Sequence, residues 1–191
     1  SLAELLMKMG RFDESIEAYR KALSFNGQFL SAFDGIAANL MYQNKHKEAQ
    51  EQLQKEFDLA RDDGERRHAL SSMAVCSTDE GKLAEALEKL SKASALAEQQ
   101  GDQAGMGQHS LARGDLLLNA GKIKEAKAEF EKAIDLARQS TIPDTVKNIA
   151  ELNYHGRLAL VASANRDFEN ANKEAEVMRA GVEALNNPNQ L

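Results

Sequence analysis

Five stretches of the chain share one pattern of small, large and polar residues. The clearest runs from Gly121 to Leu136, and the other copies open at Gly10, Asn44, Gly81 and Arg166. A small residue lies five positions after each opening residue, and a second packing residue follows four positions later: Ser15 and Tyr19, Ala49 and Leu53, Ala86 and Leu90, Ala126 and Phe130, Ala171 and Ala175. Residues four apart share one face of a helix. The pattern therefore predicts a helix that packs through this face, repeated five times.

Each of these helices is preceded by another stretch with apolar residues at helical spacing. The opening residues lie 34 residues apart at the start of the chain and 45 apart at its end. Only two prolines interrupt the sequence, which is 42% hydrophobic and 28% charged, as folded helical proteins are. We expect an all-α fold, a single α-solenoid of about five antiparallel helix pairs, with repeats at 1–28 (truncated), 29–61, 62–100, 101–140 and 141–187.

Turn and capping residues mark the ends of the predicted helices. Helices are expected from Asp13 to Phe25, from Phe29 to Tyr42 and from Lys47 to Ala60, and the last helix is expected to reach Leu185. The predicted N-terminal caps are Asp13, Asp102 and a capping box of Asp62 with Glu65. Left-handed backbone is expected at Asn26-Gly27 and at Asn44, and a turn at Asn186-Asn187-Pro188.

The repeated residues resemble the tetratricopeptide repeat, whose first helix carries a Leu-Gly pair and whose second carries a late small residue. The Leu-Gly positions hold Leu2-Ala3, Ile36-Ala37, Met73-Ala74, Arg113-Gly114 and Leu158-Ala159, and the late small position holds Ala22, Glu56, Ala93, Ala133 and Met178. The family's terminal Pro is missing, and the longer intervals are similar to the extended repeats of motor light chains and bacterial sensor-regulators. The resemblance implies a right-handed superhelix that acts by binding and has no catalytic activity.

Charge and composition exclude several classes of partner. A net charge of −6 and a pI near 5.3 oppose general nucleic-acid binding, which needs a basic face. No run of 18 apolar residues would span a bilayer, so no membrane contact is expected of this segment. The single cysteine, Cys76, excludes an internal disulfide framework and is compatible with a reducing compartment such as the cytoplasm. We expect the chain to be a fragment of a larger protein.

No residue pattern predicts catalysis, a cofactor or a metal site. The histidines form no HExxH or HxH motif, and His46 takes an apolar turn position where packing explains it: His46, His68, His109 and His155. Cys76 is predicted to be a buried, inert thiol, and the glycines from Gly101 to Gly107 to allow close helix packing rather than to bind phosphate. The basic cluster at Arg66 and Arg67 is predicted to pair with neighbouring acidic residues, with an anion or acidic-peptide contact as the alternative.

Function is therefore expected on the leading helix of each pair, which lines the ligand groove in the resembled family. The positions carried over are Asp34, Ala38, Tyr42, His68, Ser71, Ser72, Val75, Gln108, Leu111, Asp115, Leu118, Asn119, Asn153, Arg157 and Leu160. Apolar and Arg anchors usually dominate such interfaces, which favours Tyr42, Leu111, Leu118, Leu160 and Arg157. The Lys, Asn and Arg clamp with which chaperone-binding members hold a terminal carboxylate is absent from the equivalent positions.

Three functional hypotheses follow from these observations. The first is a non-catalytic scaffold that binds a peptide or partner protein in the groove. The second is a peptide- or ligand-sensing regulatory module of a larger bacterial protein, suggested by the lengthened repeats. The third is self-association through uncapped ends, because no preceding helix covers Leu2, Leu5 and Leu6.

Overall fold

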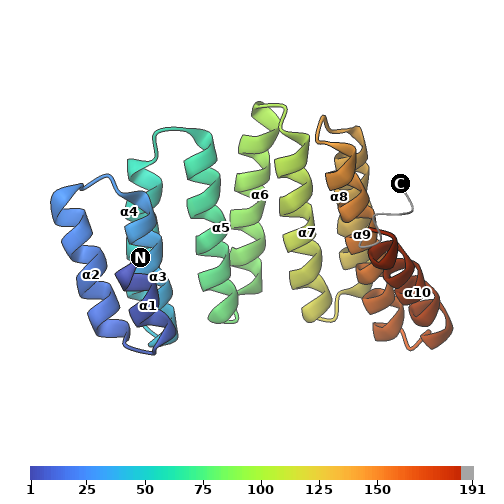
Figure 1. The fold of residues 1–191 in the computed structure, drawn as a ribbon, viewed down its shortest axis with the longest axis horizontal. Coiled ribbons are helices and arrows are strands. Elements are labelled where there is room, and N and C mark those ends of the chain that lie inside the picture. The colour runs from blue at the N-terminus through green and yellow to red at the C-terminus, as the bar shows by residue number, and fades with distance from the viewer. Residues whose placement is uncertain (186–191) are drawn as a thin grey trace. The chain divides into compact units, whose positions relative to one another are not determined.

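The protein is an all-α helical repeat solenoid. The computed structural model describes residues 1–185, and this part of the chain contains ten helices and no strand (Figure 1). The helices are α1 (Leu2–Lys8), α2 (Phe12–Phe25), α3 (Leu30–Tyr42), α4 (His46–Leu59), α5 (Asp63–Asp79), α6 (Leu83–Gln99), α7 (Gln103–Asn119), α8 (Ile123–Gln139), α9 (Asp144–Ala164) and α10 (Phe168–Leu185). The predicted turn at 186–188 lies outside the described residues. None of the described helices is long and apolar enough to cross a membrane.

The turn inside each helix pair has the same backbone at all five opening residues of the sequence pattern. Gly10, Gly81 and Gly121 have φ between 74° and 75°, Asn44 has φ of 58° and Arg166 has φ of 59°. Glycine adopts this left-handed conformation without steric cost and asparagine at little cost, whereas arginine is strained there. In each turn the next amide donates to a carbonyl five positions back, for example Lys122 N to Leu117 O at 2.9 Å. The repeated turn is therefore confirmed.

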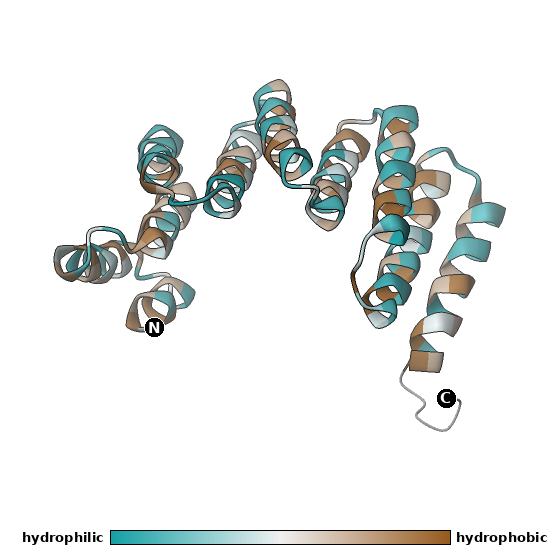
Figure 2. Cartoon of the chain, turned by 90° about the horizontal axis from the view of Figure 1, so that it is seen from above, coloured by the Kyte–Doolittle hydropathy of each residue, from teal (hydrophilic) through white to brown (hydrophobic). Residues whose placement is uncertain are grey.

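The chain divides into two compact units, Ser1–Ala97 and Glu98–Leu191, which we describe separately. In both units the helices carry hydrophobic residues along one side and hydrophilic residues along the other (Figure 2). In the first unit the core contains Ile16, Ile36, Leu53 and Met73, contributed by α2 to α5 in turn. The small residues predicted to face neighbouring helices, such as Ala49 and Ala86, are completely buried.

A buried polar cluster joins the first three helices of this unit. Ser15 Oγ donates to Ala3 O at 2.7 Å and accepts from Asn39 Nδ2 at 3.0 Å, and both Ser15 and Asn39 are fully buried. Because these hydrogen bonds connect buried groups of all three helices, the cluster helps to fix how α1, α2 and α3 meet.

In the second unit, α8 packs on α7 through a close approach. Phe130 is completely buried against Gly114, where an added Cβ would overlap the ring. The fifth copy of the pattern behaves differently, because α10 contains no buried residue and Ala175 is exposed. The predicted burial of its packing face is therefore wrong. Instead, α9 and α10 meet where Gly181 faces Leu152.

Several predicted helix ends need correction. Asp13 does not cap α2, which begins at Phe12; its carboxylate accepts a hydrogen bond from Gln43 at 2.8 Å. Asp62 and Asp102 do cap their helices, at 2.8 Å from the amides of Glu65 and Gly105. The Glu65 carboxylate accepts from the amide of Arg61 instead of closing a capping box. Asn26 has extended backbone with φ of −142°, so the left-handed end predicted there is wrong.

Candidate functional site

The predicted groove residues lie on the four leading helices α3, α5, α7 and α9, and none of them is buried. Their side chains are exposed or half-buried, in contrast to the core residues that alternate with them on the same helices. Leu6, predicted to lie uncovered at the start of the chain, is buried, whereas Leu2 and Leu5 are exposed.

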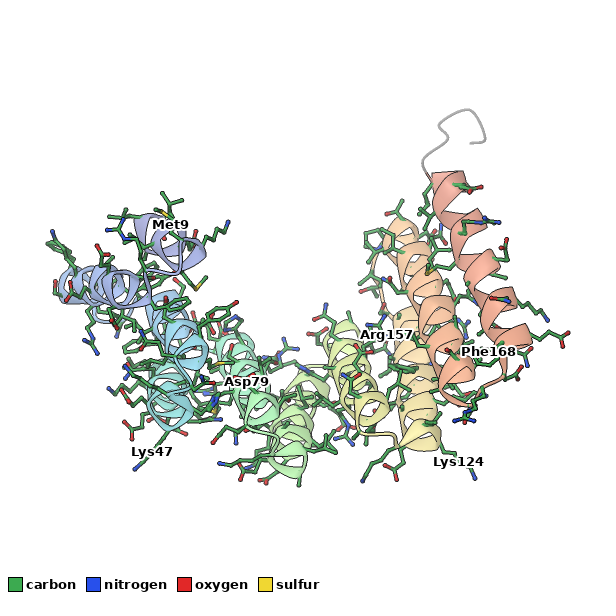
Figure 3. All side chains as sticks on the ribbon, turned by 90° about the horizontal axis from the view of Figure 1, so that it is seen from below. Met9, Lys47, Asp79, Lys124, Arg157 and Phe168 are labelled. Carbon is green, nitrogen blue, oxygen red and sulfur yellow. The ribbon has the colours of Figure 1, made fainter. Side chains whose placement is uncertain are left out.

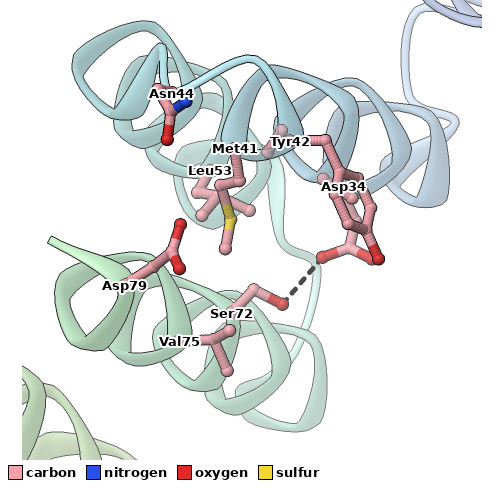
Figure 4. A pocket seen from close by; sticks show the side chains of 10 residues that line it. Asp34, Met41, Tyr42, Asn44, Leu53, Ser72, Val75 and Asp79 are labelled. Carbon is pink, nitrogen blue, oxygen red and sulfur yellow. Dashed lines mark hydrogen bonds between the residues drawn. The ribbon is translucent and has the colours of Figure 1, made fainter. Parts of the chain in front are cut away.

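A pocket of about 540 Å³ lies between α3 and α5 (Figure 4). Its walls combine apolar side chains with two carboxylates, and the lining residues are Asp34, Ala37, Ala38, Met41, Tyr42, Asn44, Leu53, Ser72, Val75 and Asp79. The structure thus brings together a subset of the predicted residues, namely Asp34, Ala38, Tyr42, Ser72 and Val75. Its volume lies within the range of ligand pockets in proteins.

Two contacts define the rim of this pocket. Ser72 Oγ donates a hydrogen bond of 2.7 Å to Asp34 Oδ1 and thereby joins α5 to α3. The ring of Tyr42 stacks on Phe12 of α2, with ring centroids 5.3 Å apart. Tyr42 nevertheless remains 66% exposed and Val75 59% exposed. The rim therefore presents apolar surface that is held in place and open to solvent.

The predicted residues His68 and Ser71 lie on α5, as Ser72 and Val75 do, but they do not line the pocket. Ser71 Oγ donates to its own helix at Arg67 O. His68 Nδ1 lies 2.9 Å from Oε1 of Glu56, a buried residue of α4. This hydrogen bond raises the pKa of His68; burial opposes the rise and the charge of Asp34 adds to it.

In the second unit, Arg157 and Asp115 form a bidentate pair between α9 and α7. Arg157 Nε and Nη2 donate to the two Asp115 carboxylate oxygens at 3.1 and 2.9 Å. The guanidinium also lies 5.7 Å from the centre of the Phe130 ring. Figure 3 labels Arg157 among the side chains of this unit. These contacts make Arg157 a link between α7 and α9. Its role as a partner anchor stays a prediction, because binding a partner would require Arg157 to give up these contacts.

A smaller pocket of about 150 Å³ lies among α7, α8 and α9 and includes Gln108 and Leu111 of the predicted set. Its other lining side chains are mainly apolar, among them Ile142, Val146 and Tyr154. The remaining predicted positions in this unit line neither of these pockets: Leu118, Asn119, Asn153 and Leu160.

The features predicted to be structural have structural contacts. Cys76 is fully buried, and burial raises the pKa of its thiol. Gly105 and Gly107 are buried in α7, and a Cβ at Gly107 would lie 3.2 Å from Ala133 O. In the basic cluster, Arg66 pairs with Asp63 at 2.6 Å, as predicted.

The sequence interpretation did not assign Met41, Asp79 or Glu56 to a site in the first unit. Met41 and Asp79 line the pocket, and the buried Glu56 pairs with His68. Glu56 alone left a visible signal, since it takes the late small position that holds Ala in three other copies. Met41 and Asp79 have no counterpart in the family pattern, so only the packed structure identifies them.

Comparisons with known proteins agree with this architecture. A family model described as a tetratricopeptide repeat-like domain matches residues 35–154, and a tetratricopeptide repeat model matches residues 1–29. No protein with a curated description matches the sequence significantly.

Solved structures share the fold at low sequence identity. Repeats of a putative kinesin light chain from Podosopora anserina are 17% identical over 98% of this chain and 94% of that one, with a TM-score of 0.70. BtubC from P. vanneervenii is 16% identical over 97% and 78%, with a TM-score of 0.73. YrrB, described as having an unusual peptide-binding site, is 16% identical over 94% and 82%, with a TM-score of 0.53. Since the first family model covers more than half of the sequence, the chain belongs to the tetratricopeptide repeat-like family, whose members are generally non-catalytic protein-interaction scaffolds.

Proposed function

We propose that this protein is a non-catalytic scaffold that binds a peptide or a segment of a partner protein on its leading helices. In this proposal the pocket between α3 and α5 receives an apolar side chain of the partner. The proposal is supported by the family, by the exposure of the predicted residues and by the solved fold relative described as having a peptide-binding site. The pocket is the observation that carries it.

The chemistry of the pocket defines the preferred partner. Met41, Leu53 and Val75 supply apolar walls, and none of the lining residues is basic. Asp34 and Asp79 lie on opposite sides of the Met41 and Leu53 side chains (Figure 4). An apolar side chain would gain by leaving water, and a neighbouring Lys or Arg would face one of these carboxylates. We therefore propose an apolar anchor residue flanked by a basic residue.

The second unit supplies less of the binding energy in this proposal. To contact a partner, Arg157 would have to break its bidentate ion pair with Asp115. The free energy lost with that pair offsets the free energy gained from the new contact. Leu111, Leu118 and Leu160 remain the candidates for further apolar contacts there. The α3–α5 pocket is consequently the main anchor point.

Selection from a displayed peptide library tests the proposal. Enriched peptides should share one apolar residue next to Lys or Arg, and their affinity is measured by fluorescence polarisation. Val75→Arg, which fills the pocket, should weaken binding at least about tenfold. Asp79→Asn should weaken it less and reduce its sensitivity to salt.

The matched control is Val177→Arg on α10, because Val177 is also an exposed valine, at 42%. It should leave peptide affinity unchanged. Circular dichroism of each variant confirms that the helices remain. Selected peptides that bind Val75→Arg as tightly as the natural sequence would contradict the proposal.

A further inference from the structure

The buried carboxylate of Glu56 is the least expected feature of the first unit. Glu56 is only 2% exposed, in a position where three other copies of the pattern hold Ala22, Ala93 and Ala133. Acidic residues are almost never fully buried without a partner, because removing a charge from water is costly. A buried carboxylate at a position that holds Ala in three other copies therefore needs a compensating charge.

His68 contacts only one of the two oxygens of the Glu56 carboxylate. Oε1 lies 2.9 Å from His68 Nδ1, but Oε2 is buried and has no hydrogen-bond partner among residues 1–185. Asp34 of α3 also lies close to this pair. One ligand atom from each of Asp34, Glu56 and His68 falls within 4.8 Å of the other two, so three helices bring two oxygens and one nitrogen close together.

We propose that Asp34, Glu56 and His68 form a binding site for one divalent transition-metal ion, with Zn²⁺ as the best fit. An imidazole ligand disfavours Mg²⁺ and Ca²⁺, which prefer oxygen ligands only. Two carboxylates balance the charge of the ion, and the ion supplies the second oxygen of Glu56 with the positive neighbour that it lacks. Three protein ligands leave at least one coordination position for water or a partner group.

The spacing is compatible with such an ion after small side-chain movements. Ligand bonds to Zn²⁺ are about 2.0–2.2 Å long, so two ligand atoms of a tetrahedral ion are about 3.4 Å apart. A separation of up to 4.8 Å must therefore close by about 1.4 Å. Asp34 and His68 are free to make this adjustment, because Asp34 is half-buried and His68 is exposed. Glu56 stays in place in the core, and the Ser72 hydroxyl orients the Asp34 carboxylate.

The competing interpretation is a plain ion pair in which a protonated His68 alone neutralises Glu56. The same chain offers an internal reference for that case. His155 and Glu174 lie 2.6 Å apart between α9 and α10, and no third metal-binding side chain joins them within the described part of the chain. Metal binding should therefore distinguish the two histidine–glutamate pairs, whereas simple ion pairing should not.

The test is a calorimetric titration of the intact chain, first treated with a chelator, with ZnCl₂ and separately with MgCl₂. We expect one saturable Zn²⁺ site per chain and no Mg²⁺ site of comparable affinity. Glu56→Gln and His68→Gln should weaken Zn²⁺ binding by at least about tenfold. His155→Gln, the matched control, should leave it unchanged. In a parallel melting experiment, Zn²⁺ should raise the midpoint of the natural chain and of His155→Gln but not of His68→Gln.

Each other result would overturn the metal site. No saturable Zn²⁺ binding, unchanged affinity in Glu56→Gln and His68→Gln, or an equal loss in His155→Gln would each assign Glu56 and His68 to a structural ion pair only. Since His68 is exposed, His68→Gln keeps the test valid if the buried Glu56 variant fails to fold. The test uses no peptide, so its outcome is independent of the proposed peptide binding.

Discussion

Two pairs of leading helices, α3 with α5 and α7 with α9, meet in different ways. In the first unit a hydrogen bond from Ser72 to Asp34 joins the helices, and a pocket of about 540 Å³ lies beside it. In the second unit a bidentate ion pair joins Arg157 to Asp115, and the guanidinium lies over the buried Phe130 ring. The leading helices thus leave a pocket in one unit and are held together by an ion pair in the other, and under the proposed function only the first of these is the main anchor point for a partner.

The largest expected effect comes from removing the aromatic ring of Phe130, which is completely buried in the second unit. Phe130→Ala should destabilise this unit by about 3–5 kcal/mol, because it leaves a cavity against Gly114 and removes the surface beneath Arg157. Hydrogen exchange of the α7 to α9 amides measures this locally, since the two units need not unfold together.

The matched control for that prediction is Phe25→Ala in the first unit, where the ring is 81% exposed. It should change stability by no more than about 0.5 kcal/mol. If Phe130→Ala proves equally mild, the second unit is not held together through this ring, and the contrast between the units fails.

A smaller and less intuitive effect is expected at the Glu56–His68 pair, measured with chelator present. His68→Ala should cost about 1–3 kcal/mol because it leaves a buried carboxylate unpaired. Glu56→Ala should cost about 1 kcal/mol or less, because it removes the buried charge itself and leaves an exposed histidine in water. Urea unfolding at pH 6 measures both, and the opposite order would show that Glu56 is solvated.

The pH dependence of this difference has a defined sign. The pKa of His68 is raised in the folded protein, so the stabilisation from its charge is complete below the unfolded value of about 6.5. It is lost as the pH rises through the folded value. The cost of His68→Ala should therefore shrink between pH 6 and pH 9, and a cost that grows with pH would contradict the assignment.

The sequence predicted the repeated turns and helices well and the state of individual side chains poorly. The turn residues were predictable because left-handed backbone restricts them to Gly or Asn at most copies, and the shared pattern located Arg166 despite its strain. Arg157 was interpreted as an anchor because its partner Asp115 is 42 residues away along the chain. Glu56 was visible as an exception at an alanine position, but His68 is on the next helix, and no helical periodicity links the two.

The smallest expected effect concerns the strength of the pair that joins α7 to α9. A double-mutant cycle of Asp115→Asn and Arg157→Gln should give a coupling energy of about 1 kcal/mol, because both charges are partly shielded and make two parallel hydrogen bonds. The same cycle at the exposed pair of Glu88 and Lys92 should give less than about 0.5 kcal/mol. If the first coupling is no larger than the second, Arg157 is only weakly held by Asp115, and it becomes available as the partner anchor that the sequence suggested.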